Sequence, residues 1–316
     1  MNTGKFKASI VLLCYNQERT IKDSLISAIN QNYSYRYKII VCDDGSKDNT
    51  VTIINNIAKN NKSIVVLSSD KNEGIAKNFN KAIPYIEGSY FITQAGDDIS
   101  LPNRLAITEK YLLKDNNQAF FSSTIDIDSK SKILNTNHGS NINERNKKLG
   151  GLNLITCILN EGGILGASAG YKTSIIKYGP LSLSNFSEDK ILTARAASLG
   201  SIYFFNNALV KYRRGSGVSI ITSHTYYKSM AKLMYRRNRF YKSIISDCLL
   251  SKKLYLIKNI DKKIYKSRLS SWHAYQLLKN KLPFYKFLFY TLIYRNYNNI
   301  TVRAIYQFLK GKIHAL

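Results

Sequence analysis

Two pairs of adjacent aspartates are the residues best suited to chemistry in this chain. They occur as Asp-Asp-Gly-Ser at 43–46 and as Gly-Asp-Asp at 96–98. Neighbouring carboxylates repel each other unless a cation or hydrogen-bond donors relieve the charge. Such groups can hold Mg²⁺, which needs only one or two carboxylates when substrate phosphates supply further ligands. The structural alternatives are a helix N-cap with a turn for the first pair and a solvated turn for the second.

The elements around these pairs alternate between two patterns. Apolar runs typical of buried strands occur at 8–14, 38–42, 64–67, 90–93 and 119–125, and stretches with helical spacing occur at 21–29, 50–58, 75–86 and 103–113. This alternation predicts βαβ units and a parallel sheet. In such sheets the ligand lies beyond the carboxyl ends of the strands. Both aspartate pairs directly follow a predicted strand, so we expect them at the same edge of one sheet.

The second half of the chain is less regular. Residues 128–150 are rich in Asn, Ser and Lys and are predicted to form a mobile connection. Helical spacing returns at 152–159 and 188–199, a strand is expected at 202–205, and a basic helical pattern extends from about residue 226. The small residues at 166–170 are explained equally well by a tight turn followed by a strand and by a wall of the acceptor site that lets a substrate approach the backbone.

Four segments resemble the motif series of family 2 inverting glycosyltransferases of the bacterial surface-polysaccharide or O-antigen type. They are I-V-L-L-C-Y-N at 10–16, V-C-D-D-G-S at 41–46, N-E-G-I-A-K-N-F-N at 72–80 and G-D-D-I-S-L-P-N-R at 96–104. The resemblance covers roughly residues 7–220. It implies the α/β GT-A fold, a Rossmann-like mixed sheet flanked by helices, as a domain over 1–220. A basic, Tyr-rich helical extension would then occupy 221–316.

The resemblance also implies roles at the donor site. Tyr15 and Asn16 would lie near the base, and Asp44 would contact the uridine. The nucleotide pocket would be lined by Asn72, Gly74 and Lys77. Asp97 would bind ribose or metal, Asp98 would bind the Mg²⁺ or Mn²⁺ that bridges the diphosphate, and Arg104 would order this loop by pairing with an acid.

The chain departs from the family pattern at two positions. Ala95 stands where the family often has an acid, and Gly215 stands where a histidine can complete the metal or diphosphate site. Arg213 or Arg214 would then meet the diphosphate, since guanidinium groups bind phosphate well. A basic turn at the domain edge explains these arginines equally well.

The sequence Glu188-Asp189 resembles the family's E-D motif, whose aspartate is the catalytic base. A sugar hydroxyl is a weak nucleophile, so a positioned carboxylate must take its proton as the new bond forms. The alternative is an acidic first helical turn after Ser187 as N-cap, which the helix dipole favours. Both interpretations of Asp189 can hold at once.

Charge and hydropathy bear on the partners. The formal net charge is +27, and residues 211–316 hold 23 Lys and Arg against two acids, Asp247 and Asp261. Basic helices with aromatic and aliphatic faces bind anionic membrane surfaces. An RNA-binding tail and a helical cap on the catalytic domain are the alternatives. With no recognisable signal peptide or membrane span, we expect a cytoplasmic protein, peripheral at the inner face of a membrane.

The expected function is transfer of a sugar, with inversion, from a nucleotide-sugar donor, most plausibly a UDP-sugar, to a saccharide or lipid-linked saccharide acceptor in cell-surface polysaccharide biosynthesis. A nucleotidyltransferase could also place acids around a metal, but no Gly-rich, Lys-containing phosphate loop follows the first strand. The other alternative is a non-catalytic nucleic-acid- or membrane-binding protein driven by the basic tail, with nucleic acid not the expected partner.

Overall fold

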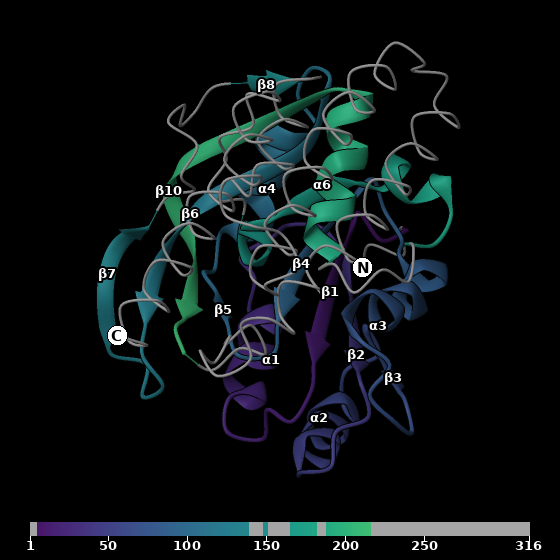
Figure 1. The fold of residues 1–316 in the computed structure, drawn as a ribbon, viewed down its shortest axis with the longest axis vertical. Coiled ribbons are helices and arrows are strands. Elements are labelled where there is room, and N and C mark those ends of the chain that lie inside the picture. Colours follow the sequence, from purple (N-terminus) through teal and green to yellow (C-terminus); the bar gives the residue numbers. More distant parts are fainter. Residues whose placement is uncertain (1–4, 139–147, 151–164, 182–187, 216–316) are drawn as a thin grey trace, which may run out of the picture. The chain divides into compact units, whose positions relative to one another are not determined.

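The computed structural model describes residues 5–138, 148–150, 165–181 and 188–215. The chain divides into two units, Met1–Ile220 and Ile221–Leu316, and the described residues lie in the first. The elements are β1 (Ala8–Cys14), α1 (Ile21–Ile29), β2 (Tyr37–Asp43), α2 (Thr50–Ala58), β3 (Ile64–Ser68), α3 (Ile75–Ala82), η1 (Ile83–Tyr85), β4 (Tyr90–Ala95), β5 (Ile99–Ser100), α4 (Arg104–Leu112), β6 (Asn117–Ile127), β7 (Ile133–His138), β8 (Lys148–Gly150), η2 (Gly166–Ser168), β9 (Gly170–Lys172), η3 (Thr173–Tyr178), α6 (Glu188–Leu199) and β10 (Ser201–Arg213) (Figure 1). The helices expected at 152–159 and from 226 onward lie outside the described residues.

The strands form one mixed sheet. Its order is β3-β2-β1-β4-β9-β6-β10-β5, with β7 paired to β6 and β8 paired to β10. The four N-terminal strands β3, β2, β1 and β4 are parallel, as the alternation of strands and helices predicts. The sequence pattern allowed a strand near residue 170 but did not predict the place of β9, which lies antiparallel between β4 and β6 and separates them. Gly166–Ser168 form the η2 turn just before β9, so this stretch is a tight turn followed by a strand.

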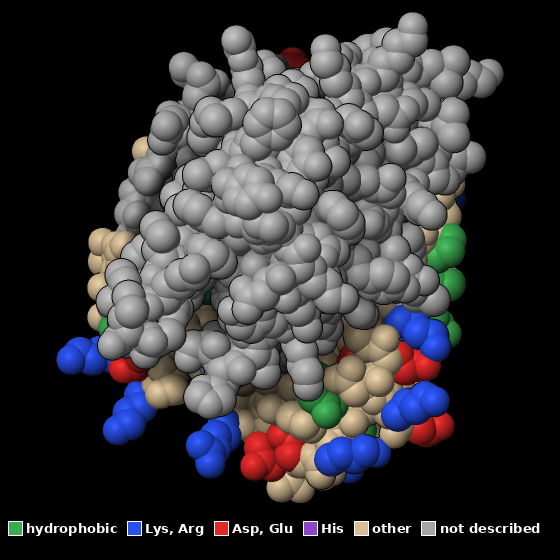
Figure 2. Space-filling model, in the orientation of Figure 1, with side chains coloured by type: hydrophobic (Ala, Val, Ile, Leu, Met, Phe, Trp, Pro, Cys, Tyr) green, Lys and Arg blue, Asp and Glu red, His purple; other side chains and the backbone are tan. Residues whose placement is uncertain are grey.

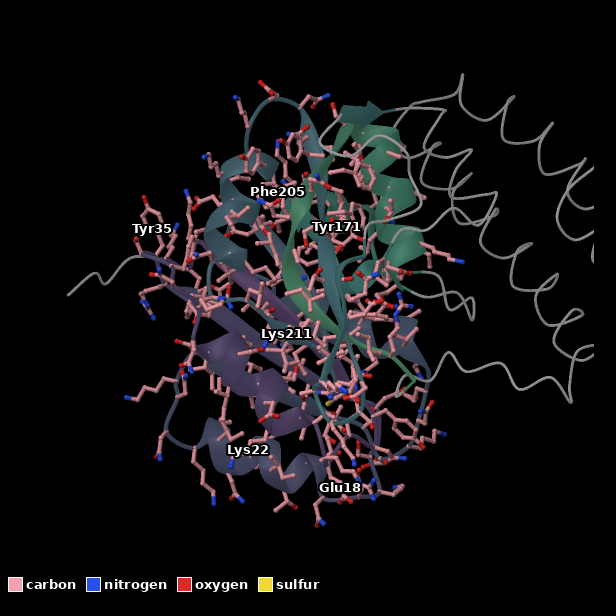
Figure 3. All side chains as sticks on the ribbon, turned by 90° about the vertical axis from the view of Figure 1, so that its left-hand side faces the viewer. Glu18, Lys22, Tyr35, Tyr171, Phe205 and Lys211 are labelled. Carbon is pink, nitrogen blue, oxygen red and sulfur yellow. The ribbon has the colours of Figure 1, made fainter. Side chains whose placement is uncertain are left out.

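Helices cover both faces of the sheet. One core contains alternate residues of β1, namely Ala8, Ile10, Leu12 and Cys14, packed against buried side chains of α1, α2 and α4. On the other face an aromatic row links Phe79 of α3 to Phe91, Tyr171 and Phe121, with successive ring centroids 5.6–6.0 Å apart. Figure 3 shows Tyr171 inside the described part and Tyr35 projecting from its edge. Strands that are apolar on both faces belong between two helical layers.

The parallel register determines where the candidate residues meet. Cys14 lies opposite Asp43, and Leu13 lies opposite Ala95. The three strands β1, β2 and β4 therefore end at the same edge, and the chain leaves each of them there. This register brings the segments that contain the two aspartate pairs to one end of the sheet, as expected for a parallel arrangement.

The expected connection at 128–150 contains strands instead. β7 pairs antiparallel with β6, and β8 pairs antiparallel with β10. The segment reads as a loop because its strands are short and polar, as edge strands commonly are. Ile133 and Leu134 of β7 are exposed. Strand β10 is also longer than the predicted 202–205, and bulges interrupt its pairing with β6.

The surface of the described part carries charges of both signs. Figure 2 shows Lys and Arg side chains next to Asp and Glu side chains along the visible rim. Within the described ranges, no helix is long and apolar enough to cross a membrane. The excess of basic residues is concentrated in 211–316, most of which falls outside these ranges.

Candidate active site

The first aspartate of the Asp-Asp-Gly-Ser turn points inward. Asp43 is fully buried, and its Oδ2 accepts hydrogen bonds from the amides of Gly45 and Ser46, at 3.0 and 2.9 Å, and from Ser68 Oγ at 3.1 Å. Its Oδ1 accepts a hydrogen bond from the Ser46 hydroxyl. Several donors on one carboxyl group hold the turn in a single conformation. Asp43 is therefore a structural residue that shapes the turn.

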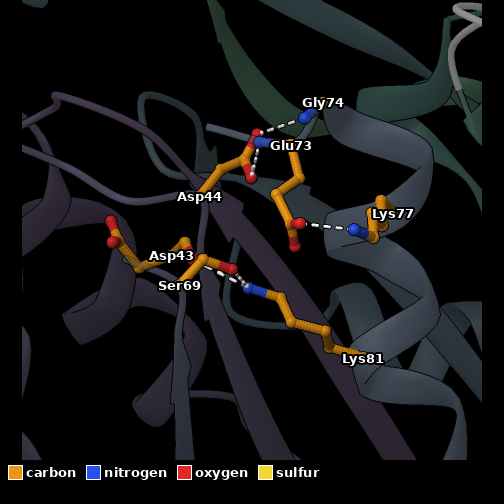
Figure 4. A network of polar contacts seen from close by, with 7 residues as sticks. All are labelled: Asp43, Asp44, Ser69, Glu73, Gly74, Lys77 and Lys81. Carbon is orange, nitrogen blue, oxygen red and sulfur yellow. Dashed lines mark hydrogen bonds and ion pairs between the residues drawn. The ribbon is translucent and has the colours of Figure 1, made fainter. Parts of the chain in front are cut away.

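Two further features fix this turn. Gly45 has φ 76°, and a Cβ there would lie 2.5 Å from the carbonyl carbon of Lys71, so only glycine fits. Lys81 of α3 donates from Nζ to the Asp43 carbonyl oxygen at 2.9 Å and to Ser69 Oγ at 2.6 Å (Figure 4). Lys81 thus connects α3 to the end of β2.

The second aspartate of the turn binds the start of α3. Asp44 Oδ1 accepts from the Glu73 amide, and Oδ2 accepts from the Gly74 amide, both at 2.9 Å (Figure 4). Gly74 is the N-cap residue of α3, where a carboxylate is stabilised by the helix dipole. Each carboxylate oxygen has a second lone pair, so Asp44 can also accept a hydrogen bond from a ligand.

The other predicted nucleotide residues surround this arrangement. The Asn16 amide donates to Ser46 Oγ, and Asn16 Oδ1 accepts from the Lys47 amide, both at 2.8 Å, so Asn16 connects the end of β1 to the turn. Tyr15 is half-buried beside it, and Asn72 is exposed. The exposed Lys77 forms an ion pair with Glu73 one helical turn earlier.

The second aspartate pair is more deeply enclosed. Asp98 is 1% exposed, and its Oδ1 accepts from the Arg213 amide at 2.9 Å. Its Oδ2 is buried without a hydrogen-bond partner in the described structure. Burial, and secondarily the neighbouring Asp97, raises the pKa of Asp98 well above its ordinary value. The enclosed oxygen is suited to a cation or a proton, since an unpaired buried charge is costly.

Asp97 and Asp98 can bind a metal ion only if a ligand supplies the remaining coordinating oxygens. No group of three His, Cys, Asp or Glu that could hold an ion occurs within the described residues. Asp97 and Asp98 supply carboxylate oxygens, of which Asp98 Oδ2 lacks a partner. Two carboxylates are enough for Mg²⁺ when phosphate oxygens complete its coordination. The donor set therefore fits a cation that arrives with a diphosphate.

Arg104 was expected to order this loop by pairing with an acid, and Asp98 is the acid whose charge acts on it. The Arg104 side chain is fully buried, and the guanidinium donates to Ser100 Oγ and to the carbonyl oxygens of Thr93, Ala167 and Ala169, at 2.8–3.2 Å. Burial lowers its pKa to about 9. An enclosed guanidinium cannot contact a nucleotide, so its role is to connect β4 with η2.

The two arginines at the end of β10 have separate surroundings. Arg213 is 3% exposed and donates from Nε to the Asp97 carbonyl oxygen at 3.0 Å and from Nη1 to the Asp128 carbonyl oxygen at 2.7 Å. Arg214 forms an ion pair with Asp126 at 2.9 Å, and its guanidinium lies over the Tyr212 ring. The more exposed Arg214 is therefore better placed than Arg213 to reach a ligand.

Asp189 lies in the first turn of α6. Its side chain is half-buried, and Oδ1 accepts from the Lys190 amide at 2.7 Å. Its carbonyl oxygen accepts from Thr193 Oγ1 at 2.6 Å and from the Tyr171 hydroxyl at 3.4 Å. These contacts fix the backbone of the turn. The carboxylate of Asp189 is thus partly exposed on a fixed turn, where an acceptor hydroxyl can approach it.

The turn η2 connects the end of β4 to Asp189. Thr93 Oγ1 donates to the Gly166 carbonyl oxygen at 2.9 Å, beside the contacts from Arg104. A Cβ on Gly166 would lie 2.4 Å from Asp189 Cβ and 2.6 Å from Asp189 Oδ2. The absence of a side chain at 166 therefore lets η2 pack directly against Asp189. Spacing in the sequence does not reveal this link, because its parts lie far apart along the chain.

This close packing leads to a prediction for Gly166→Ala. The added methyl group must displace Asp189, and misplacing a catalytic group by about 1 Å can cost roughly 100-fold in rate. We expect sugar transfer to fall by about that factor while UDP affinity, measured by calorimetry, changes less than about twofold. An equal loss of UDP affinity would contradict the assignment of this contact to the base.

The geometry defines a class of protein: an α/β protein with an acidic site at the carboxyl edge of its parallel strands. The model of the family "Glycosyl transferase family 2" matches residues 9–179, more than half of the chain. The chain belongs to this family, so the resemblance read from the four sequence segments is confirmed.

Individual relatives agree with this assignment. The chain is 35% identical to EpsE of Bacillus subtilis (strain 168) over 36% of its own length and 41% of EpsE. It is 30% identical to the Escherichia coli UDP-Glc:alpha-D-GlcNAc-diphosphoundecaprenol beta-1,3-glucosyltransferase WfgD over 41% of this chain and 49% of WfgD. The matched region thus spans less than half of either relative.

A solved structure supports the fold. The structure of S. aureus TarS 1-349 in complex with UDP-GlcNAc superposes with a TM-score of 0.58, covering 94% of this chain and 90% of that chain at 15% identity. The predicted GT-A fold, a mixed sheet flanked by helices, is confirmed.

Proposed function

We propose that this protein is an inverting glycosyltransferase that moves a sugar from a UDP-sugar to a saccharide or lipid-linked saccharide acceptor. The observation that carries this proposal is the link from the acidic turn after β4, through Thr93 and Gly166, to Asp189. It joins a candidate donor site to a candidate base within one family 2 domain.

At the donor side, Asp44 would accept a hydrogen bond from the uracil N–H, because its carboxylate is already oriented by two backbone amides. Tyr15, Asn16, Asn72, Gly74 and Lys77 would border the nucleoside. Arg214 forms an ion pair with Asp126, but its side chain is exposed. It would therefore reach the diphosphate. Charge-assisted bonds of this kind are stronger than neutral ones.

The chemical step would use Asp189. Its carboxylate takes the proton of the acceptor hydroxyl while that oxygen attacks the anomeric carbon and the bond to the UDP oxygen breaks. A single displacement inverts the anomeric configuration. Asp97 and Asp98 would hold Mg²⁺ or Mn²⁺, which would supply charge stabilisation for the leaving diphosphate. The residues of this chain would thus orient both partners of the displacement.

The setting of the reaction is part of the proposal. WfgD acts on a diphosphoundecaprenol-linked sugar by its name, and a lipid-linked acceptor would suit a protein whose C-terminal third is strongly basic. We place the catalytic domain at 1–220 and a membrane-associating region at 221–316, at the inner face of the membrane. No described feature favours nucleotidyl transfer or nucleic acid binding.

Nucleotide binding tests the donor site. We expect UDP affinity to fall at least about tenfold when EDTA removes divalent cations, while uridine affinity stays the same, because only the diphosphate shares ligands with the cation. Asp97→Ala should reproduce this selective loss. Asp44→Ala should instead weaken UDP and uridine alike, since hydrogen bonds to charged groups contribute about 1.5–3 kcal/mol. Calorimetry with UDP and with uridine measures these affinities for the wild type with and without EDTA, for Asp97→Ala and for Asp44→Ala. An equal loss of affinity for uridine and UDP in EDTA would reject the metal assignment.

A further inference from the structure

Glu188 is a buried acid that the proposed chemistry does not use. Its side chain is 7% exposed, and Oε2 is buried without a hydrogen-bond partner in the described part of the chain. It occupies the first turn of α6 with Asp189, which is half-buried. A carboxyl group in such a place is more stable when it is neutral, because backbone amides compensate only part of the desolvation of an ionised group.

The surroundings of Glu188 explain its proton affinity. Burial, and then the negative charge of Asp189, raises the pKa of Glu188 from 4.5 to about 8, and the amides of Glu188 and Asp189 offset this only in part. Among the described residues, the titratable groups that interact with this carboxyl are Asp189 on the same turn and Tyr171 on β9. Neither residue is a cation, so neither Asp189 nor Tyr171 would stabilise an ionised Glu188.

Ionisation of Glu188 would also affect Asp189, the candidate base. An ionised Glu188 would have to move toward water or distort the helical turn that it shares with Asp189. Asp189 has little room to follow, because η2 packs against it at Gly166 and its carbonyl oxygen is held by Thr193. A change in the turn would therefore strain or displace the base.

We propose that Glu188 is a positioning residue: its buried carboxyl group, while neutral, keeps the first turn of α6 and with it Asp189 in place, and its ionisation would disturb that turn. This inference rests on the proposed function, because it assigns the alkaline limit of sugar transfer to a residue beside the base. Glu188 itself need not touch the substrate.

The linkage to stability has a defined sign. The folded protein keeps the Glu188 proton up to about pH 8, whereas the unfolded chain releases it near 4.5. This group therefore lowers the free energy of unfolding progressively as the pH rises from about 4.5 to about 8. Glu188→Gln keeps the shape and removes the titration. Its melting temperature should exceed that of the wild type at pH 8.5 by more than it does at pH 5.

Two measurements test the proposal. The first is the pH profile of kcat for wild type, Glu188→Gln and the control Glu87→Gln, which changes an exposed glutamate paired with Lys38. We expect kcat of the wild type and of the control to fall about tenfold per pH unit above about pH 8. Glu188→Gln should retain its activity at pH 7 and lose this fall. A Glu188→Gln profile that falls like the wild type, or a loss of activity at every pH, would overturn the proposal.

The second measurement does not need activity. Carbon-13 NMR of labelled Glu and Asp carboxyl carbons, assigned with Glu188→Gln and Asp189→Asn, follows both groups through a pH titration. We expect the Glu188 resonance to titrate near pH 8 and the Asp189 resonance to shift at the same midpoint. A Glu188 midpoint near 4.5 would overturn the proposal. If the wild type transfers no sugar from any donor, the proposed function has failed, and this titration still decides whether Glu188 is neutral and coupled to Asp189.

Discussion

Replacing Asp189 with asparagine should abolish most sugar transfer while leaving the donor site intact. The amide has nearly the same shape but cannot accept the proton of an acceptor hydroxyl. A positioned general base contributes about 100- to 10,000-fold to rate, so kcat should fall by a factor in that range. UDP affinity should change less than about twofold, because Asp189 contacts η2 and the first turn of α6 rather than the β2 turn.

The matched control is Asp23→Asn. Asp23 is also an acid in the first turn of a helix, α1, but its side chain is exposed. Its replacement should cost only the small dipole contribution and leave kcat unchanged. Steady-state kinetics with UDP-sugar and acceptor, beside calorimetry with UDP, separate the two outcomes. If Asp189→Asn retained more than about a tenth of wild-type kcat, another group would have to be the base.

The second large effect is expected at Asp43, on stability. In Asp43→Asn an NH₂ group replaces one of the two oxygens that accept hydrogen bonds from Gly45, Ser46 and Ser68. At the Oδ2 position the NH₂ group faces two backbone N–H donors, and at the Oδ1 position it faces the Ser46 hydroxyl, which can accept only by giving up its own hydrogen bond to this side chain. Hydrogen bonds to charged groups contribute about 1.5–3 kcal/mol each, so the free energy of unfolding should fall by about 3 kcal/mol or more. At about 2–4 °C per kcal/mol, the melting temperature should drop by roughly 6–12 °C.

Asp70→Asn is the control for this change. Asp70 is exposed near the same edge, and the contact it makes with Lys47 uses its carbonyl oxygen, which the substitution keeps. Its melting temperature should match that of the wild type. UDP affinity should fall in Asp43→Asn even below the melting transition, because Asp43 shapes the turn that presents Asp44. A variant with wild-type stability and weakened UDP binding would mean that Asp43 binds the ligand directly.

The N-terminal half of the fold follows from local pattern. The bounds of β1, α1 and α2 coincide with the predicted 8–14, 21–29 and 50–58. Continuous apolar runs separated by helical spacing leave few alternatives to a parallel sheet. The same pattern correctly indicated that the two aspartate pairs follow strands at one edge. Family membership could also be predicted from the sequence, because four short segments have the residue types and the order of the family's motifs.

The tertiary structure decided what each residue of those segments does. Asp43 and Asp44 are adjacent and identical in type, yet one is enclosed by the turn and the other binds the start of α3. Arg104 and Arg213 are arginines near an acidic loop in the sequence, but their guanidinium groups bind carbonyl oxygens in the interior. Sequence spacing specifies residue types at a sheet edge; it does not specify which side chains the backbone encloses.

Long-range contacts were beyond the reach of pattern for the same reason. β9 inserts between β4 and β6, and Gly166 packs on Asp189, through pairings between residues tens of positions apart. Local periodicity reports the environment of a segment and not the identity of its partner. The sequence by itself determined the family, the sheet edge and the acids available there. Only the fold determined which acid is deeply buried without a partner, which is held by backbone amides, and which is partly exposed, because burial and hydrogen bonding depend on residues far apart in the sequence.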